Sequence, residues 1–199
     1  MQSIYDLNMK MATDMLAEKG QKSYRAKQLF QWLYRKRVGS FQEMTDMPAS
    51  LLEELAQEYS IEPVKEITRQ VACDGTTKYL FQLADGSSVE TVLMHFHFGE
   101  SLCVTSQLGC NMGCTFCASG LLKKQRDLTA GEIVGQVMFV QKELDKIGKR
   151  VDNVVIMGTG EPFDNYDNVM RFCEIINSDL GLAIGARHIT ISTCGIVPR

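Results

Sequence analysis

The second half of the chain alternates between short apolar strands and long amphipathic helices. The predicted strands lie at 101–107, 152–158 and 188–193, and the predicted helices at 128–148 and 166–178. Thr129 and Glu132 form a capping box, which marks the beginning of the first of these helices. Because a crossover helix lets the next strand run parallel to the one before it, this order predicts a parallel α/β core.

Two other patterns precede this core. Residues 1–62 predict a helical domain, because apolar side chains recur there at helical spacing. Residues 63–100 predict three strands separated by Asp-Gly pairs, which supply the positive φ that tight hairpin turns need. We therefore expect three domains: a helical domain at 1–62, an antiparallel β-meander at 63–100 and the α/β core at 101–199.

The third strand of the α/β core comes directly before the last residues of the sequence. Three parallel strands with two crossover helices leave an apolar sheet edge uncovered. Either another element covers that edge, or the 199 residues are a fragment of a longer protein, which is the interpretation we favour.

The composition is that of a globular protein without a membrane-spanning segment. Hydrophobic residues make up 45% and charged residues 23%, as in ordinary globular domains, and no apolar run is long enough to span a membrane. The first residues lack the pattern of an export signal, so we expect a cytoplasmic protein. In that compartment the seven cysteines favour metal binding or catalysis over disulfides. A net charge of −3 argues against a nucleic-acid-binding surface over the whole molecule and leaves room for a local one.

Three cysteines, Cys110, Cys114 and Cys117, lie within eight residues on the loop after the first parallel strand. Thiolates select zinc or iron–sulfur clusters. A closed zinc site needs a fourth ligand, and a predicted strand separates the nearest histidines, His95 and His97, from this loop. A [4Fe–4S] cluster held by three cysteines leaves one iron free to chelate S-adenosylmethionine. We expect a cluster here; a zinc site or three packing cysteines are the alternatives.

The CxxxCxxC spacing, with Phe116 before the last cysteine, resembles the signature of radical S-adenosylmethionine (SAM) enzymes. The second predicted strand ends in "MGTGEP", and Gly160 and Glu161 there resemble the turn that receives the amino group of SAM. The resemblance implies an α/β fold that forms the N-terminal part of a partial (βα)6 radical-SAM barrel. It also implies that a [4Fe–4S] cluster is held by Cys110, Cys114 and Cys117, and SAM by Phe116, Gly160, Glu161 and Ser192.

Four longer segments narrow this resemblance: "CVTSQLGCNMGCTFCASG", "RDLTAGEIVGQV", "VVIMGTGEPFDNYDNV" and "GARHITISTCGIVP". They are similar to the RlmN-type adenine-C2 RNA methyltransferases, from about Tyr24 to the last residue. The resemblance implies methylation of adenosine at C2 in 23S rRNA, in the peptidyl transferase centre, and in tRNA, at the adenosine 3′ of the anticodon. It further implies an external flavodoxin-like reductant, no membrane association and a monomer.

In that family the methyl group passes through a methyl-cysteine before a radical step adds its carbon to the adenine, and a disulfide closes the cycle. The resemblance assigns Glu90 as the proton acceptor and Cys103 as the resolving cysteine. Without it, Glu90 reads as a solvated carboxylate, and Cys103 as a small buried hydrophobic residue. The methyl-carrying cysteine belongs to a C-terminal region, and Cys73, Cys173 and Cys194 do not match it. We therefore expect those three to be structural, and the 199 residues alone to be inactive.

The segment from Lys22 to Arg37 carries six cations, no acid and four aromatic residues. Cations for phosphates and aromatics for bases predict an RNA-facing helical domain; the alternative is a solvated helix with its aromatics in the core. Lys123, Lys124 and Arg126 could add phosphate contacts. Two other functions stay open: a C8-specific adenine methyltransferase of the Cfr type, and a non-catalytic iron–sulfur or zinc module that binds RNA.

Overall fold

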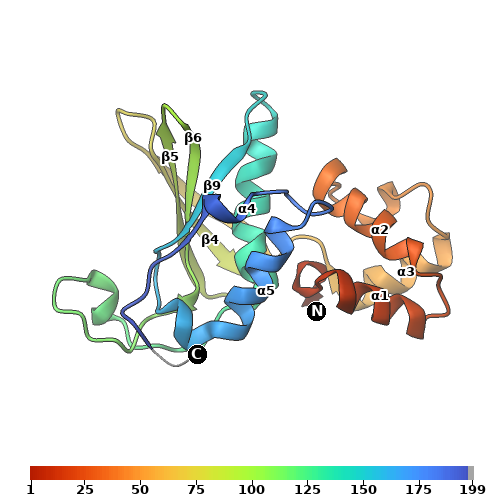
Figure 1. The fold of residues 1–199 in the computed structure, drawn as a ribbon, viewed down its shortest axis with the longest axis horizontal. Coiled ribbons are helices and arrows are strands. Elements are labelled where there is room, and N and C mark those ends of the chain that lie inside the picture. Colours follow the sequence, from red (N-terminus) through yellow and green to blue (C-terminus); the bar gives the residue numbers. More distant parts are fainter. Residues whose placement is uncertain (197–199) are drawn as a thin grey trace.

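A computed structural model describes residues 1–196 of the chain. Its elements form successive layers: a helical unit, then the helices α4 and α5, then a six-stranded sheet (Figure 1). The strand order in this sheet is β10-β9-β6-β5-β4-β3. The face of the sheet away from α4 and α5 is open, and the cysteine loop extends on that side (Figure 1).

The first three strands of the sheet form the predicted antiparallel meander, β3 (Val64–Val71), β4 (Thr77–Leu83) and β5 (Ser88–Phe96). Both Asp-Gly turns are present, with φ near +86° at Gly75 and +85° at Gly86. The meander does not end at a separate sheet, because β5 pairs antiparallel with β6 (Gly99–Val104).

The predicted parallel core is confirmed. Strand β6 pairs parallel with β9 (Val151–Ile156), and β9 pairs parallel with β10 (Ile189–Ile191). Strand β5 therefore covers one side of the parallel set, while β10 lies at the sheet edge within residues 1–196. Coverage of a sheet edge by another element was one of the two alternatives that the sequence left open, and the meander is the element that covers the β6 edge.

Helices α4 (Ala130–Asp145) and α5 (Tyr166–Asn177) pack on one face of the sheet (Figure 1). The predicted capping box begins α4: the Thr129 hydroxyl accepts the Glu132 N–H at 3.2 Å, and the Glu132 carboxylate accepts the Thr129 N–H at 2.9 Å. Burial of the apolar stripes of both helices against the strands supplies the main driving force for this layer.

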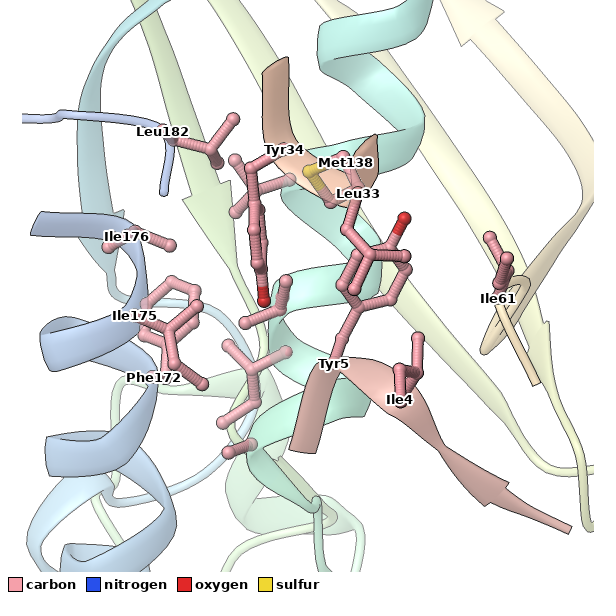
Figure 2. Close-up of a cluster of buried hydrophobic side chains, with 14 of the residues drawn as sticks. Ile4, Tyr5, Leu33, Tyr34, Ile61, Met138, Phe172, Ile175, Ile176 and Leu182 are labelled. Atoms are coloured by element: carbon pink, nitrogen blue, oxygen red, sulfur yellow. The ribbon is translucent and has the colours of Figure 1, made fainter. Parts of the chain in front are cut away.

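The helical unit contains α1 (Met9–Glu18), α2 (Tyr24–Phe30), which continues as one π-helical turn to Lys36, and α3 (Ala49–Glu58). Short parallel strands, β1 (Gln2–Ser3) and β2 (Tyr59–Ser60), bring its two ends together. Figure 2 shows Tyr5 and Tyr34 of this unit in one apolar cluster with Met138 of α4 and Phe172 of α5. The helical unit therefore shares a continuous core with the α/β part.

The aromatic residues proposed for RNA contact are mostly in this core, which corrects that expectation. Phe30, Trp32 and Tyr34 are buried, and only Tyr24 of the four is exposed. The apolar face of this helix, formed by Ala26, Leu29, Phe30 and Leu33, packs inward. The aromatic side chains on the same side of the helix are therefore buried with it.

Several cations of this segment are also engaged within the chain. Arg37 forms an ion pair with Asp145 of α4 at 3.3 Å, and Arg35 donates to the Asp179 carbonyl. Lys36 lies over the Trp32 ring. These contacts attach the segment to the rest of the molecule.

In the part of the chain that the structure describes, no helix is long and apolar enough to cross a membrane.

Candidate active site at the carboxyl ends of the strands

The parallel strands β6, β9 and β10 bring three segments to the same end of the sheet. These are the cysteine loop at 110–122, the "GTGEP" turn at 158–162 and the residues that follow β10. The carboxyl ends of parallel strands are where ligand sites form in α/β proteins. All the predicted cofactor-binding residues belong to these segments.

Backbone hydrogen bonds close the cysteine loop at its base. The short strands β7 (Gln107–Leu108) and β8 (Arg126–Asp127) pair antiparallel, and the Cys110 N–H donates to the Leu122 carbonyl at 2.8 Å. Within the loop, the Cys117 N–H donates to the Cys114 carbonyl at 3.1 Å. All seven cysteines of the chain are free thiols, and Cys117 is exposed while Cys110 and Cys114 are half-buried.

The donor set of this loop fits an iron–sulfur cluster. Within residues 1–196, no three Cys, His, Asp or Glu side chains converge on a point suited to a single metal ion. A cluster does not require such a point, because each thiolate binds a different iron. His95 is engaged elsewhere, with Glu100 and with the Gly75 carbonyl. Phe116 is 92% exposed, so its ring is open to contact with a ligand.

Glu161 is held by the protein more tightly than expected. It is only 3% exposed, and its carboxylate accepts the Phe163 N–H at 2.9 Å, the Thr193 hydroxyl at 2.6 Å and the Cys194 N–H at 2.8 Å. Burial raises the pKa of this carboxyl, but the hydrogen bonds outweigh burial and leave the pKa below its ordinary value. Glu161 is thus an ionised group that joins the end of β9 to the end of β10.

Glu90 and Cys103 share the open face of the sheet. Cys103 pairs with Val92, so the side chains of Glu90, Val92 and Cys103 point to the same side, away from α4. The intervening residues Leu93 and Leu102 point to the helices and are buried. Glu90 is exposed and forms an ion pair with Lys78 at 3.1 Å. Cys103 is half-buried, and burial raises the pKa of its thiol.

Across the parallel strands the same face continues through Val155, which pairs with both Cys103 and Thr190. Ser192 follows two residues later and is exposed; its N–H donates to the Ile156 carbonyl at 3.3 Å. Of the three cysteines expected to be structural, Cys173 packs partly against the core, as expected, but Cys73 and Cys194 are exposed.

Cys194 belongs to the candidate site, which the sequence analysis did not predict. The neighbouring Glu161 carboxylate raises the pKa of its thiol, and Cys114 contributes in the same direction. Gln107 was also missed as a member of the site. Lys124, which was expected to contact a phosphate, pairs with Asp127 and Asp164 instead. Arg126 likewise pairs with Asp85 and Glu132. The only signal in the sequence was the polar run "TSQ" at the end of a parallel strand.

Comparisons with known proteins agree with this geometry. Residues 2–61 match the model of the ribosomal RNA large subunit methyltransferase N-terminal domain, and residues 104–199 match that of the radical SAM superfamily. A probable dual-specificity RNA methyltransferase RlmN of Streptococcus suis is 57% identical over 99% of this chain and 54% of its own length. The chain belongs to the RlmN family of radical SAM proteins. This family uses a [4Fe–4S] cluster and S-adenosylmethionine, as predicted.

Another relative, the probable dual-specificity RNA methyltransferase RlmN of Enterococcus faecalis, is 57% identical over 100% of this chain and 56% of its own length. The crystal structure of a radical SAM methyltransferase from Sphaerobacter thermophilus superimposes with a TM-score of 0.93 at 40% identity, covering 100% of this chain and 58% of that protein. The predicted fold, part of a radical-SAM barrel, is therefore confirmed. The chain spans about half the length of the curated relatives it matches.

Proposed function

We propose that the full-length protein is a methyltransferase that transfers a methyl group to C2 of adenosine in 23S rRNA and tRNA. The names of the relatives support an RNA methyltransferase. The observation that carries the proposal is that the cysteine loop and the GTGEP turn lie at the carboxyl ends of β6 and β9, where hydrogen bonds join the residues leading into the loop, Ser106 and Gln107, to the turn. RNA substrates of this kind would place the reaction in the cytoplasm.

Cys110, Cys114 and Cys117 would hold the cluster through their free thiols. Gly160, Glu161, Ser192 and Phe116 would contact S-adenosylmethionine, with the backbone of the turn close to the ligand and Phe116 free to stack on it. When bound, the cluster and S-adenosylmethionine supply the electron and the carbon-centred radical that methylation of an unreactive ring carbon needs.

Glu161 would act mainly by keeping a negative charge beside the turn. Its carboxylate is ionised, and its hydrogen-bond partners within the chain are neutral, so its charge is not cancelled by a contacting cation. S-adenosylmethionine carries both an ammonium and a sulfonium, and a negative site favours both. The turn can therefore attract the cofactor even though the carboxylate oxygens are occupied.

Glu90 and Cys103 would face the adenine from the open side of the sheet. Residues that are offset by two positions across paired strands lie about 7–8 Å apart, close enough for both to approach one base. The raised pKa keeps the Cys103 thiol protonated at neutral pH until a base or a substrate changes its surroundings. The Glu90 carboxylate, paired only with the exposed Lys78, could accept a proton there.

The helical unit lies on the other side of α4 and α5 from this face (Figure 1), so it would contact a different part of the RNA; the match of residues 2–61 to a ribosomal RNA methyltransferase domain supports that role. The exposed Tyr24 and the lysines Lys22 and Lys27 are the better candidates for contact, since the other aromatics are buried. We further propose a monomer that takes electrons from a flavodoxin-like reductant. The polypeptide of 199 residues alone is expected not to complete methyl transfer.

The test is an anaerobic assay of the full-length protein loaded with iron and sulfide. It receives transcripts of 23S rRNA and tRNA, S-adenosylmethionine labelled in its methyl group, and a flavodoxin-like reductant. Mass spectrometry of the nucleosides should find labelled 2-methyladenosine in both RNAs. Labelled 8-methyladenosine would favour the Cfr type. Stoichiometric zinc without cleavage of S-adenosylmethionine would favour a non-catalytic module and overturn the proposal.

A further inference from the structure

Gln107 lies at the junction of the cysteine loop and the GTGEP turn, and it is completely buried. Its amide N–H groups donate to Asp127 at 2.7 Å and to Asp164 at 3.2 Å, and its carbonyl accepts the Glu161 N–H at 2.8 Å. One side chain therefore connects the segments before and after the cysteine loop with the turn that follows β9.

The bonds use both N–H donors and the carbonyl oxygen of the amide in one orientation. A glutamine side chain has two N–H donors and one carbonyl acceptor, and here two carboxylates face the donors while a backbone N–H faces the acceptor. The reverse orientation would turn the carbonyl oxygen toward carboxylates. A glutamate at position 107 would place a third negative charge against the carboxylates of Asp127 and Asp164. The surroundings thus require a neutral amide of this length.

A half-buried cation, Lys124, extends the junction to the far side of the cysteine loop. Lys124 bridges the same two carboxylates, at 2.8 Å from Asp127 and 2.7 Å from Asp164. Lys124 follows the cysteine loop, whereas Asp164 follows the GTGEP turn. Both ends of the loop are therefore attached to the turn, one through the amide of Gln107 and the other through Lys124.

The backbone around Gln107 is held close to the GTGEP turn. The N–H groups of Ser106 and Gln107 both donate to the Thr159 carbonyl at 3.1 Å. Gly160 has φ near +114°, and a Cβ built on it would lie 2.6 Å from the Gln107 Cβ, so only glycine permits this approach. A shift of the Gln107 side chain would move the turn.

We infer that Gln107 is a positioning residue that sets the distance between the cysteine loop and the GTGEP turn, and thereby the affinity for S-adenosylmethionine. The inference rests on the proposed function, in which the cluster on one segment and the turn on the other contact the same S-adenosylmethionine molecule. Gln107 itself touches neither reacting group; it acts through Glu161 and through the base of the loop.

Gln141 provides a matched control. It is also buried, at 2% exposure; its carbonyl accepts the Val151 N–H at 2.9 Å, and its amide donates to Asp145 at 2.9 Å and to the Lys149 carbonyl at 3.5 Å. Like Gln107, it accepts one backbone N–H and donates two hydrogen bonds, but to one carboxylate and one backbone carbonyl, and it lies at the amino end of β9. Gln107→Leu and Gln141→Leu therefore each remove three hydrogen bonds, from opposite ends of the strands.

The experiment uses the full-length protein loaded with iron and sulfide. Iron content and urea unfolding are measured first, and then S-adenosylmethionine is titrated while the electron paramagnetic resonance spectrum of the reduced cluster is recorded. We expect both variants to lose similar stability. Only Gln107→Leu should weaken S-adenosylmethionine binding, by about 10- to 100-fold, as for other residues that orient metal ligands, and alter the spectral change that binding causes.

Gln107→Asn is the second variant, because it keeps the amide but is too short to make all three bonds. It should bind S-adenosylmethionine more weakly than the wild type even if Gln107→Leu does not fold. Equal affinities in the wild type, Gln107→Asn and Gln141→Leu would overturn the inference and leave Gln107 as a structural residue. A wild-type protein that takes up no cluster would instead overturn the proposed function, and this inference with it.

Discussion

The two ends of the parallel strands stabilise a buried carboxylate in opposite ways. At the amino end, Glu100 accepts from Lys149 at 2.6 Å and contacts His95. At the carboxyl end, Glu161 accepts only from neutral N–H and O–H groups. Both carboxyls have a pKa below the ordinary value, although burial alone would raise it. The same residue type is thus neutralised by a cation at one end and left charged at the other.

This difference indicates which end is built for stability and which for binding. At the amino end, charges and amide groups satisfy one another, and Asp152 also accepts the Glu100 N–H at 2.8 Å. At the carboxyl end, Asp127 and Asp164 both pair with Lys124, whereas the hydrogen-bond partners of Glu161 within residues 1–196 are neutral. A cationic ligand such as S-adenosylmethionine would balance the charge of Glu161. Substitutions at the carboxyl end should therefore reduce function more than stability, and those at the amino end the reverse.

The largest expected effect is that of Cys114→Ala in the full-length protein. Iron content should fall toward background and RNA methylation by at least about 1,000-fold, a loss of about 4 kcal/mol of transition-state stabilisation. The free energy of unfolding of the metal-free protein should change by less than about 1 kcal/mol, because Cys114 is only half-buried in a loop. Iron analysis, the methylation assay and urea unfolding measure these three quantities.

Cys73→Ala is the control for that substitution. Cys73 is exposed next to the β3–β4 turn, where Gly75 contacts His95, so it lies at the amino end of the parallel strands. Its replacement should change neither iron content nor methylation. A loss of iron in Cys73→Ala, or normal iron in Cys114→Ala, would break the distinction between the two ends.

Gln141→Leu should show the converse pattern at the amino end. The Val151 N–H would lose its acceptor while remaining buried, which costs about 1–3 kcal/mol in the free energy of unfolding. Methylation per folded molecule should stay within about twofold of wild type, since Gln141 does not contact the candidate site. Urea unfolding and the methylation assay, each at matched protein concentration, test the two parts separately.

Glu161→Gln should have a smaller effect, which isolates the charge at the carboxyl end. An amide carbonyl at the Oε1 position can still accept the two hydrogen bonds from the Phe163 N–H and the Thr193 hydroxyl, while the bond from the Cys194 N–H to Oε2 is lost. Hydrogen bonds to a charged acceptor are stronger than those to a neutral one by about 1 kcal/mol. We expect S-adenosylmethionine to bind about 5- to 10-fold more weakly, as measured by calorimetry on the cluster-loaded protein. Unchanged affinity would mean that the charge of Glu161 serves only to hold the ends of β9 and β10 together.

The sequence alone predicted the order of the strands and helices, because period, caps and Asp-Gly turns are local signals. Thr129 with Glu132, and Gly75 and Gly86, are where the patterns place them. The joining of the meander to the parallel strands was not predictable, since the pairing of β5 with β6 has no local code. The cation-rich segment was misread in part because helical spacing puts Phe30 and Tyr34 on the buried stripe.

The candidate site was predicted where a motif carried it and missed where partners come from distant segments. The three cysteines and the GTGEP turn are contiguous patterns. Gln107 is bonded to Asp164, 57 residues later, and Glu161 to Thr193, 32 residues later. Periodicity and spacing do not encode which polar side chains the strand ends bring together.

The smallest expected effect is a dependence of stability on pH that arises at the amino end. Hydrogen bonds from Lys149 and His95 hold the pKa of the Glu100 carboxyl below its ordinary value, against the effect of burial. A lowered pKa in the folded state means that ionised Glu100 stabilises the fold above the ordinary carboxyl pKa of about 4.5 and that this stabilisation is lost as the pH falls through the lowered value.

Urea unfolding of wild type and Glu100→Gln from pH 6 to pH 3 measures this contribution. The difference in free energy of unfolding between the two proteins should be about 1 kcal/mol or less at pH 6, because Lys149 is partly exposed, and should shrink toward acid pH. Glu161→Gln, compared in the same way, should show a similar acid-side decrease, since the pKa of Glu161 is also lowered.

The two ends should differ in salt dependence. Added salt should weaken the contribution of Glu100 to stability, which depends on a cation, and leave that of Glu161 nearly unchanged. Equal sensitivity to salt at both ends would contradict the contrast between a paired and an unpaired carboxylate.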